Sequence, residues 1–576
     1  MNLLFAICNR LQEPCPAVKA TRRASASRTP MTRILRLLTR GATVGQTNVV
    51  YRNAAEEQVE RSTRVSDSSN SVEEAFVPAF GERIDQISVR RPDDPALIFA
   101  PVASNETVVT WRQLVTRSNQ IARMLTQRDV DARSAVVVGA WNRPEHILVT
   151  IAAWKLGALV LPLRAVLPAR ERDEILSLAK PAIVYAEWDE TTYPTLTDVD
   201  LERIGDYSGN SLPDNPPHPG KAIASGGSTG RSKIIVDRMW HPCAPLSGSR
   251  RTGSRAGQTQ LLAAPLYHNS PFLTTYSGLA NEHTLIMMEK FDAAQAVDLI
   301  ERYRVNYAYF PPIIMRRIAM LPNIQERDFS SIEAIQSSAA PCPDWLKRFW
   351  IDLIGAEKVY EVYGSTEGIG ATIIRGDEWL DHPGSVGRPV GCEIKILDEN
   401  GHDLPRGEVG EVFMRPIEGR VPSFEYIGAP DARSTPDGFK SISDLGWVDE
   451  DGFLYIADRR VDLIVTGGAN VYPAEVEAAL SDHPGLADVV VIGVPDEEWG
   501  RRVHAVVQVS DVSMPPSALE LDAHCRERLA SYKAPKTYEF VDELPRNEAG
   551  KIRRSALVAE RESGWIAGMV LAKEAR

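Results

Sequence analysis

A run of glycine, hydroxyl and basic residues near the middle of the chain has the composition of a phosphate-binding loop. It spans Ser225 to Lys233 and reads Ser-Gly-Gly-Ser-Thr-Gly-Arg-Ser-Lys. Glycine lets the backbone approach a ligand closely, and the hydroxyl, guanidinium and ammonium groups can donate to the oxygens of a polyphosphate. The apolar runs Ala222–Ala224 and Ile234–Val236 on either side predict a strand–loop–strand hairpin, unlike a Walker A motif. A flexible hairpin tip is the plain alternative for this loop taken alone.

A second segment, Tyr360–Gly368, reads Tyr-Glu-Val-Tyr-Gly-Ser-Thr-Glu-Gly. The ring of Tyr363 can stack on a nucleotide base, and the hydroxyl of Thr366 can bond a phosphate. The carboxylate of Glu367 can hold Mg²⁺, a hard cation that prefers oxygen ligands. Taken alone, the segment is also typical of a strand that ends at a capping threonine.

Two later segments supply a carboxylate and a cation. Asp444, in the run Ser-Asp-Leu-Gly-Trp, can accept hydrogen bonds from both hydroxyls of a ribose, and Arg459 adds a donor further along. Lys551 follows Gly550 in a loop, and a lysine on a glycine-hinged loop can enter a cleft as a mobile positive charge. Considered one by one, these residues also fit ordinary surface charge at turns.

The elements that must hold these residues alternate between helices and apolar strands. Apolar residues at helical spacing predict helices over residues 110–125 and 144–156. Apolar runs predict strands at residues 135–138, 158–161, 261–264, 284–288, 307–310 and 334–336. This alternation is typical of an α/β fold with parallel sheets.

The pattern changes between Gly384 and Asp458, where turn pairs such as Asn400-Gly401 and Asp437-Gly438 separate short alternating runs. These pairs predict hairpins in a small β-rich subdomain. After Asp458, two helical and two strand-like segments are enough for a small α+β domain.

The chain therefore divides into three predicted parts. Residues 1–73 form a basic, disordered extension, residues 74–458 a large α/β domain with its β-rich subdomain, and residues 459–576 a small, mobile α+β domain. A length of 576 residues fits more than one hydrophobic core.

Composition and charge narrow the classes of function. The chain is 43% hydrophobic and 25% charged, with a net charge of −12, which argues against nucleic acid as the main partner. The six cysteines are scattered without a CxxC pair, so neither a zinc site nor a disulfide framework is indicated. Reduced cysteines fit a cytoplasmic location, and no stretch has the length and apolar character of a membrane span.

The N-terminus leaves alternatives open. Residues 1–40 contain eight Arg or Lys and one acidic residue, Glu13. The Arg-rich run Thr21–Arg40 fits an organelle transit peptide, a disordered tail, or sequence upstream of a start at Met31.

In order and spacing, these motifs resemble the AMP-forming adenylate superfamily, which contains acyl-CoA synthetases, adenylation domains of peptide synthetases and firefly luciferase. The resemblance covers roughly residues 74–560 and rests on the following segments: Ser225–Lys233, Tyr363–Glu367, Ser443–Asp444, Asp458–Glu477 and Asn547–Lys551. The phrase Pro265–Asn269 looks most like fatty-acid, bile-acid and aryl-acid CoA ligases.

The resemblance implies ATP, Mg²⁺ and coenzyme A as cofactors, and a small domain that rotates between two half-reactions. It assigns catalytic roles to four residues: Thr366 would contact phosphate, Glu367 would bind Mg²⁺, Lys551 would contact the acyl carboxylate and the α-phosphate, and His268 would lie near the acyl pocket. The remaining residues that it assigns to cofactor binding are Ser225, Gly226, Gly227, Ser228, Thr229, Gly230, Lys233, Ser338, Ala339, Ala340, Tyr363, Gly364, Ser365, Asp444, Arg459, Gly467 and Gly468.

Two departures from the family pattern bear on these expectations. The pivot position, two residues after Arg459, is Val461 where Asp or Lys is frequent, which weakens the case for the thioester half-reaction. Ser232 and Ser443 stand where Pro and Gly are common, and neither change removes a chemical group.

The resulting prediction is an ATP-dependent, AMP-forming carboxylate ligase that makes an acyl-adenylate and then an acyl-CoA thioester. The alternative is a stand-alone adenylating enzyme of secondary metabolism that passes the activated group to a carrier protein in trans or to an amine, or that activates nitrite for diazotisation. A nucleotide-binding relative without activity is a third alternative, against which Glu367, Asp444 and Lys551 all argue.

The acid itself is described only by class. Residues expected near the acyl group, namely His268, Pro311–Met315 and Gln336–Ala340, are mixed in size and mostly uncharged. They favour an apolar or aromatic acid over an amino acid. A homodimer is one alternative for the assembled state.

Overall fold

The computed structural model describes residues 77–571, apart from residues 103, 189–190, 214–215, 217, 227–231, 245–251, 418–423, 460–461, 467–468, 497–498, 548–549 and 563–568. The chain separates into two compact units, Met1–Glu74 and Ala75–Arg576. All described residues belong to the second unit, so the predicted extension over residues 1–73 lies outside them.

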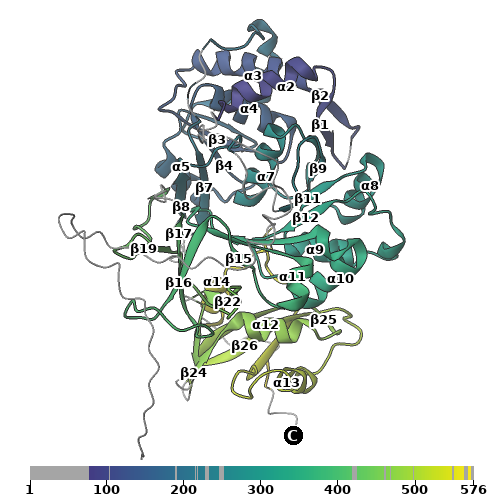
Figure 1. Cartoon of the computed structure of the whole chain (residues 1–576), viewed down its shortest axis with the longest axis vertical. Coiled ribbons are helices and arrows are strands. Elements are labelled where there is room, and N and C mark those ends of the chain that lie inside the picture. Colours follow the sequence, from purple (N-terminus) through teal and green to yellow (C-terminus); the bar gives the residue numbers. More distant parts are fainter. Residues whose placement is uncertain are drawn as a thin grey trace, which may run out of the picture. The chain divides into compact units, whose positions relative to one another are not determined.

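A nine-stranded sheet forms the centre of the large domain, with the strand order β15-β14-β13-β12-β11-β9-β10-β1-β2 (Figure 1). The six inner strands pair in parallel, whereas β2, β14 and β15 add antiparallel edges. The strands are β1 (Pro95–Ala100), β2 (Thr107–Thr110), β9 (Thr259–Leu262), β10 (Thr284–Met288), β11 (Tyr307–Tyr309), β12 (Ala334–Ser337), β13 (Val359–Gly364), β14 (Ala371–Arg375) and β15 (Arg388–Pro389). The predicted parallel α/β architecture is confirmed.

A second, four-stranded parallel sheet has the order β4-β3-β5-β6. Its strands are β3 (Ala135–Gly139), β4 (Leu159–Pro162), β5 (Ile183–Ala186) and β6 (Thr195–Leu196). One apolar core joins this sheet to the nine-stranded sheet through helices α2 (Phe80–Arg90), α3 (Trp111–Thr126), α4 (Pro144–Lys155) and α7 (Asn269–Ala280). Thr110 caps α3 through a capping box with Gln113, which sets the start of the predicted helix.

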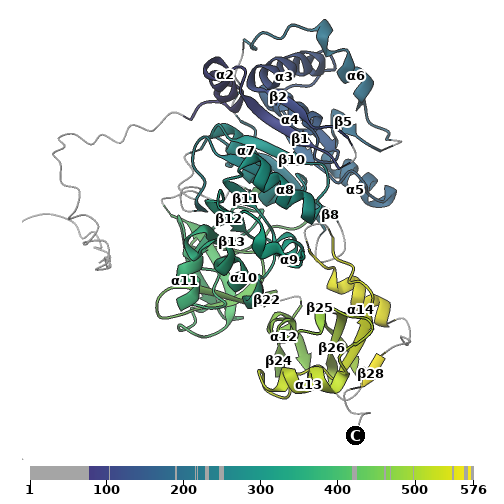
Figure 2. The same cartoon turned by 90° about the vertical axis from the view of Figure 1, so that its right-hand side faces the viewer.

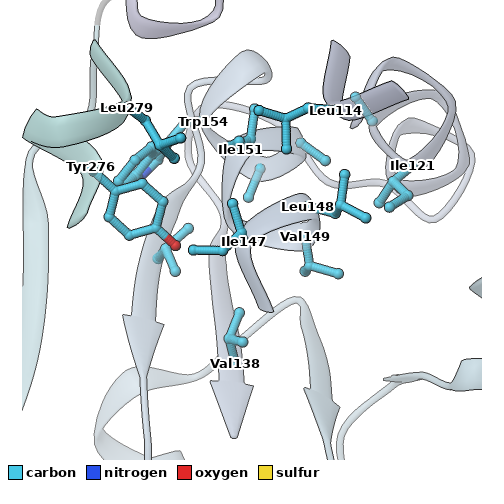
Figure 3. Close-up of a cluster of buried hydrophobic side chains, with 14 of the residues drawn as sticks. Leu114, Ile121, Val138, Ile147, Leu148, Val149, Ile151, Trp154, Tyr276 and Leu279 are labelled. Carbon is cyan, nitrogen blue, oxygen red and sulfur yellow. The ribbon is translucent and has the colours of Figure 1, made fainter. Parts of the chain in front are cut away.

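Helix α4 is buried on almost all sides, as a helix between two sheets must be. Ile147, Leu148 and Ile151 are fully buried, and Trp154 packs against Tyr276 of α7 with ring centroids 4.6 Å apart (Figure 3). This packing fixes α7, and with it the residues at the N-terminus of α7.

The other face of the nine-stranded sheet is covered by α8 (Ala293–Tyr303), α9 (Pro312–Ala319) and α10 (Asp344–Ile354), which share a second apolar core with it (Figure 2). Three further helices are α5 (Ala169–Ala179) and the short α6 (Asp198–Glu202) and α11 (Gly376–Asp381).

The predicted phosphate hairpin and β-rich region form two antiparallel sheets. β7 (Lys221–Gly226) pairs with β8 (Ser232–Asp237), and β8 pairs with β18 (Phe424–Ile427). The strand–loop–strand prediction is therefore confirmed. The second sheet comprises β16 (Cys392–Leu397), β17 (Gly410–Pro416), β19 (Arg433–Ser434), β20 (Lys440–Ser441), β21 (Asp444–Val448) and β22 (Leu454–Arg459).

The C-terminal segment has its own α+β core, as predicted. A sheet of order β25-β26-β27-β28 packs α12 and α13 on one face and α14 on the other. Its elements are β23 (Ile464–Thr466), β24 (Ala469–Val471), α12 (Pro473–Ser481), β25 (Leu486–Asp496), β26 (Gly500–Val509), α13 (Ala518–Arg526), β27 (Thr537–Val541), α14 (Arg554–Glu562) and β28 (Met569–Leu571). The exact boundary at residue 458 stays a prediction.

None of the helices built from the described residues combines the length and the apolar character needed to cross a bilayer.

Candidate functional site

A cleft of about 2500 Å³ brings together residues from every predicted motif that the structure describes. They come from β7 and β8, from the ends of β12 and β13, from β21, and from the loop before α14. Its lining includes Ser225, Lys233, His268, Ser338, Ala339, Ala340, Tyr363, Gly364, Ser365, Thr366, Glu367, Asp444 and Lys551. Residues from the middle and the end of the chain thus share one cavity.

Glu367 lies in the loop after β13, and its carboxylate is held from two sides. The Lys233 ammonium group lies 3.5 Å from Glu367 Oε1, and the hydroxyl of Tyr426 donates to the same oxygen at 2.6 Å. Lys233 also lies 3.8 Å above the centre of the Tyr426 ring. The carboxylate lines the cleft, where its oxygens could serve as ligands for a hard cation.

Asp444 begins β21, opposite Arg459 of β22, and accepts a hydrogen bond of 2.6 Å from the hydroxyl of Tyr363. The preceding Ser443 has a φ of 70°. Glycine adopts this conformation without strain, which explains why glycine suits that position. The backbone turn at Ser443 directs Asp444 into the cleft beside the ring of Tyr363.

Ser338, Ala339 and Ala340 follow β12 at the carboxyl edge of the parallel sheet, next to the end of β13. Ala339 has a φ of 79°, a rare conformation for a residue with a side chain. The Ser338 hydroxyl lies within hydrogen-bond distance of the hydroxyls of Ser270, at 3.0 Å, and Tyr309, at 3.1 Å. These three hydroxyl groups link β11, β12 and α7 at the floor of the cleft.

His268 immediately precedes α7, and its ring stacks obliquely on Tyr267 with centroids 4.3 Å apart. Burial lowers the pKa of His268 to about 3, and the positive charges of Lys551 and Arg164 act in the same direction. The ring is therefore neutral at physiological pH and cannot act there as a cationic acid. It lines the cleft, as the sequence predicts.

Lys551 is exposed at the end of a tight turn before α14. Its backbone N–H donates to Asn547 Oδ1 at 2.8 Å, and its carbonyl accepts from the Asn547 N–H at 2.9 Å. Arg546 donates to the carbonyl of Gly550 at 2.8 Å, and Gly550 has a φ of 74°. The turn is thus fixed by its own polar groups, and its lysine contributes to the cleft.

Several predicted site residues lie outside the described part of the chain. They are Gly227, Ser228, Thr229, Gly230, Val461, Gly467 and Gly468. For Gly226 and Arg459 only the backbone is described, in β7 and β22.

One expectation about the acyl end of the cleft is wrong. Of the run Pro311–Met315, only Pro311 lines the cavity. Ile314 and Met315 are buried in the core that α8, α9 and α10 share with the sheet, because the helical period of α9 turns them away from the cleft. Met239, Trp240 and Leu273 are apolar lining residues that were not predicted.

Two further residues of the site escaped prediction. Tyr426 holds Glu367 from β18, and the buried ammonium group of Lys221 donates to the backbone carbonyl of Thr366 at 2.6 Å. Both contacts join residues that are distant in the sequence, so no local spacing signals them.

Comparison with known proteins agrees with this geometry. The profile of the AMP-binding enzymes matches residues 84–417, and that of the AMP-binding enzyme C-terminal domain matches residues 475–551. The chain belongs to the AMP-binding enzyme family. The family match covers more than half of the chain and spans both the large domain and the small C-terminal domain.

Curated members of the AMP-binding enzyme family align along most of their length. The fatty acid–[acyl-carrier-protein] ligase ScoC of Streptomyces coeruleorubidus is 31% identical over 478 residues, which is 78% of this chain and 91% of ScoC. A 2-succinylbenzoate–CoA ligase of Bacillus pumilus is 30% identical over 458 residues, covering 78% and 92% of the two chains.

Solved structures of the AMP-binding enzyme family share the fold. The o-succinylbenzoate CoA synthetase MenE from Bacillus subtilis, in complex with its acyl-adenylate intermediate, superposes with a TM-score of 0.71 at 26% identity, covering 83% of this chain and 98% of MenE. ATP-bound MatB from Rhodopseudomonas palustris superposes equally well, at 26% identity with coverage of 84% and 99%.

The residues of the cleft fit the ATP and Mg²⁺ that the AMP-binding enzyme family implies. Among the described residues, the Ser365 hydroxyl and His268 Nε2 are buried polar atoms that line the cleft and have no hydrogen-bond partner, so both can bond a polar group of a bound ligand. The described residues contain no cluster of three or more His, Cys, Asp or Glu suited to a metal ion. A single carboxylate such as Glu367 suits Mg²⁺, which commonly uses one or two carboxylates together with substrate phosphates.

Proposed function

We propose that this chain is an ATP-dependent, AMP-forming ligase that converts a small carboxylic acid into an acyl-adenylate and transfers the acyl group to the thiol of coenzyme A. One observation carries the proposal. Two carboxylates and two lysines line one cleft although they are far apart in the sequence: Lys233, Glu367, Asp444 and Lys551. Membership of the AMP-binding enzyme family supports it.

Each residue has a role that follows from its chemistry. Lys233, from β8, would bind the phosphates, and Asp444 would accept the ribose hydroxyls beside an adenine that contacts Tyr363. Glu367 would hold Mg²⁺, which when bound neutralises phosphate charge. Thr366 would donate to a phosphate.

Lys551 would act on the reacting atoms themselves. A carboxylate that attacks the α-phosphate is an anion approaching an anion, so catalysis requires positive charge between them. The turn that ends at Lys551 is held by Asn547, and Lys551 lines the cleft. The phosphorus–oxygen bond to pyrophosphate breaks as the acyl oxygen bonds to phosphorus.

The acyl pocket favours an apolar or aromatic acid. The described lining of the cleft includes, besides His268, the apolar residues Met239, Trp240, Leu273 and Pro311. Relatives named for 2-succinylbenzoate, indoleacetate and ferulate act on acids with an aromatic ring, and an aromatic acid would fit the same kind of pocket.

A carrier protein in trans is a second candidate for the acceptor. The relative ScoC is named as a ligase that loads an acyl-carrier protein, and coenzyme A and a carrier protein present a thiol of the same kind. The first half-reaction is identical for both acceptors, so the two candidates differ only in the second.

A pyrophosphate-release screen tests the proposal. The full chain is incubated with Mg²⁺-ATP and each of benzoate, indoleacetate, ferulate, 2-succinylbenzoate, decanoate and nitrite, with and without coenzyme A. We expect acid-dependent pyrophosphate release from at least one carboxylic acid, and AMP with an acyl-CoA when coenzyme A is added. Pyrophosphate release with nitrite and with none of the carboxylic acids would show that the substrate is nitrite and not a carboxylic acid. Pyrophosphate release without a thioester in the presence of coenzyme A would favour a different acceptor.

A further inference from the structure

Lys221, the first residue of β7, is a lysine buried beneath the site. Its side chain is only 3% exposed. The ammonium group donates to the carbonyl of Thr366 at 2.6 Å and to Asn269 Oδ1 at 2.9 Å, and it lies 3.6 Å from Asp237 Oδ2. The ammonium group therefore makes two hydrogen bonds and one ion pair, each to a different segment of the chain.

Each of these partners is next to a residue of the site. Thr366 and Glu367 share the loop after β13, and Asn269 follows His268 at the start of α7. Asp237 lies directly across the hairpin from Lys221 in the β7–β8 register. The buried ammonium group of Lys221 thus joins the base of the β7–β8 hairpin to the loop that carries Thr366 and Glu367 and to the start of α7 beside His268.

Asp237 extends this network to the wall of the cleft. Its Oδ1 accepts the backbone N–H groups of Met239, at 3.0 Å, and Trp240, at 3.3 Å, while its Oδ2 faces Lys221. Met239 and Trp240 line the cleft. The carboxylate is therefore held by the turn that follows β8 even without the lysine.

We propose that Lys221 is a positioning residue for adenylation, whose ammonium group fixes the carbonyl of Thr366 and thereby aims Thr366 and Glu367 at the phosphates. The inference rests on the proposed function of the same site. An ammonium group that donates to a carbonyl in a dry interior makes a strong, directional bond. Without it, the loop loses the hydrogen bond that ties the carbonyl of Thr366 to the base of the hairpin.

A purely structural role is the competing explanation, in which Lys221 only neutralises the buried Asp237. Removal of one partner of a buried pair is destabilising, because it leaves an uncompensated charge, whereas replacement of both partners can be neutral. Stability alone therefore cannot distinguish the two roles, but the kinetics of ATP can.

The chain offers a matched control in Lys155 of α4. Its side chain is 4% exposed, and its ammonium group lies 3.1 Å from Asp85 Oδ1 and 2.5 Å from Asn119 Oδ1. It has the same kinds of side-chain partner as Lys221, a carboxylate and an asparagine. Asp85 and Asn119 do not line the cleft, whereas the partners of Lys221, namely Thr366, Asn269 and Asp237, do.

The experiment compares Lys221→Met, Lys155→Met and the double variant Lys221→Met/Asp237→Asn in the full chain. The double variant removes both charges and keeps an oxygen acceptor for the turn, so it guards against misfolding of the single variant. Mg²⁺-ATP binding is measured by calorimetry, and acid-dependent pyrophosphate–ATP exchange gives kcat/KM for ATP and, separately, KM for the acid.

We expect kcat/KM for ATP to fall roughly 10- to 100-fold in Lys221→Met, as for loss of a charge-assisted hydrogen bond, and to stay low in the double variant although its melting temperature recovers. Lys155→Met should lose thermal stability and change kcat/KM for ATP by less than about twofold. Recovery of kcat/KM to the native value in the double variant would overturn the positioning role.

The two hypotheses fail in different ways. Absence of acid-dependent exchange in the native chain would refute the proposed function, and Mg²⁺-ATP affinity would then carry the test of Lys221. Equal ATP affinity in the native chain and in the double variant would overturn the role of Lys221 in that case. A native chain that binds no Mg²⁺-ATP would overturn both.

Discussion

The two parts of the chain that form the cleft present their charged groups differently. In the large domain, Glu367 lies between Lys233 and Tyr426, and Asp444 lies against Tyr363. In the small domain, Lys551 extends from an exposed turn that is held by its own backbone and by Asn547. The side chains that we propose to receive a nucleotide are thus fixed in advance, which would lower the cost of binding.

The two settings suit different roles in the proposed reaction. Fixed dipoles and charges suit a ligand that binds in one pose, whereas charge that shifts between two half-reactions suits a group that can enter and leave. Gly550 lies close to Ile313 of α9: a Cβ atom added to this glycine would lie 3.0 Å from the Ile313 side chain. The loop therefore approaches the large domain closely where a glycine permits it.

The largest expected effect follows removal of Lys551. We predict that Lys551→Ala lowers acid-dependent pyrophosphate–ATP exchange about 100-fold or more, since one preorganised catalytic donor is worth that much, while the Kd for Mg²⁺-ATP stays within about threefold. Lys536→Ala, in the same domain but outside the cleft, is the control. If Lys551→Ala lowered the affinity for Mg²⁺-ATP about 100-fold as well, Lys551 would bind the nucleotide as the groups of the large domain are proposed to do. The difference between the two domains would then be lost.

Glu367→Gln should come next, because it removes the anionic oxygen and keeps the shape. We expect kcat/KM for ATP to fall roughly 10- to 100-fold and the Mg²⁺ concentration for half-maximal rate to rise. The exposed Glu425→Gln on β18, whose native carboxylate pairs with Arg238, should leave both values unchanged. Unchanged Mg²⁺ dependence in Glu367→Gln would remove the metal role.

Asp444→Asn sharpens the assignment of the ribose side. We predict an increase in KM for ATP of about tenfold, as for hydrogen bonds to a charged group. The native protein should also discriminate against 2′-deoxy-ATP and 3′-deoxy-ATP, and the variant should lose most of that discrimination. If variant and native protein discriminate equally, Asp444 does not contact the ribose.

Tyr426→Phe tests how much the fixed setting of Glu367 contributes. The variant removes one hydrogen bond of 2.6 Å and keeps the ring over Lys233. Glu367 keeps its ion pair with Lys233 in this variant, so we expect a decrease in kcat/KM for ATP of about 3- to 20-fold, less than full loss of a hydrogen bond to a charged group would give, measured in the same exchange assay. If Tyr426→Phe lowered kcat/KM for ATP as much as Glu367→Gln does, the expectation that Glu367 contributes more than its hydrogen bond with Tyr426 would be wrong.

The smallest effect concerns stability against pH at His268. Burial lowers the pKa of His268 to about 3 in the folded chain, against an ordinary value of 6.5, so between these values the unfolded chain binds the extra proton. Stability therefore rises with pH across that window. His268→Asn should reduce the difference in unfolding free energy between pH 7 and pH 5 by about 2 kcal/mol, as measured by urea titration. If His268→Asn left this pH difference unchanged, protonation of the His268 ring would not reduce the stability of the folded chain.

The sequence predicts a strand well where a continuous apolar run ends at turn residues. Thr284–Met288 and the strands beside the phosphate loop are continuous apolar runs with turn residues at their ends, and the structure has them as β10, β7 and β8. The described motif residues also converge on one cleft, because the carboxyl ends of neighbouring parallel strands β12 and β13 meet at one edge of the sheet. The individual roles stay predictions.

Contacts between distant residues are what the sequence does not reveal. Lys221 and Thr366 lie 145 positions apart, and Tyr426 and Glu367 lie 59 apart. Only the sheet order brings each pair together. The expected lining by Ile314 and Met315 was wrong for a related reason, since which face of α9 is buried depends on its packing against α8 and α10.

The most direct test of adenylation is isotope exchange between pyrophosphate and ATP, measured with Mg²⁺ and an acid selected in the release screen, in the absence of any acceptor. We predict exchange that requires both the acid and Mg²⁺, that is lost in Lys551→Ala, and that is retained in Lys536→Ala. Exchange that is independent of the acid, or that persists at the native rate in Lys551→Ala, would contradict an adenylate formed in this cleft.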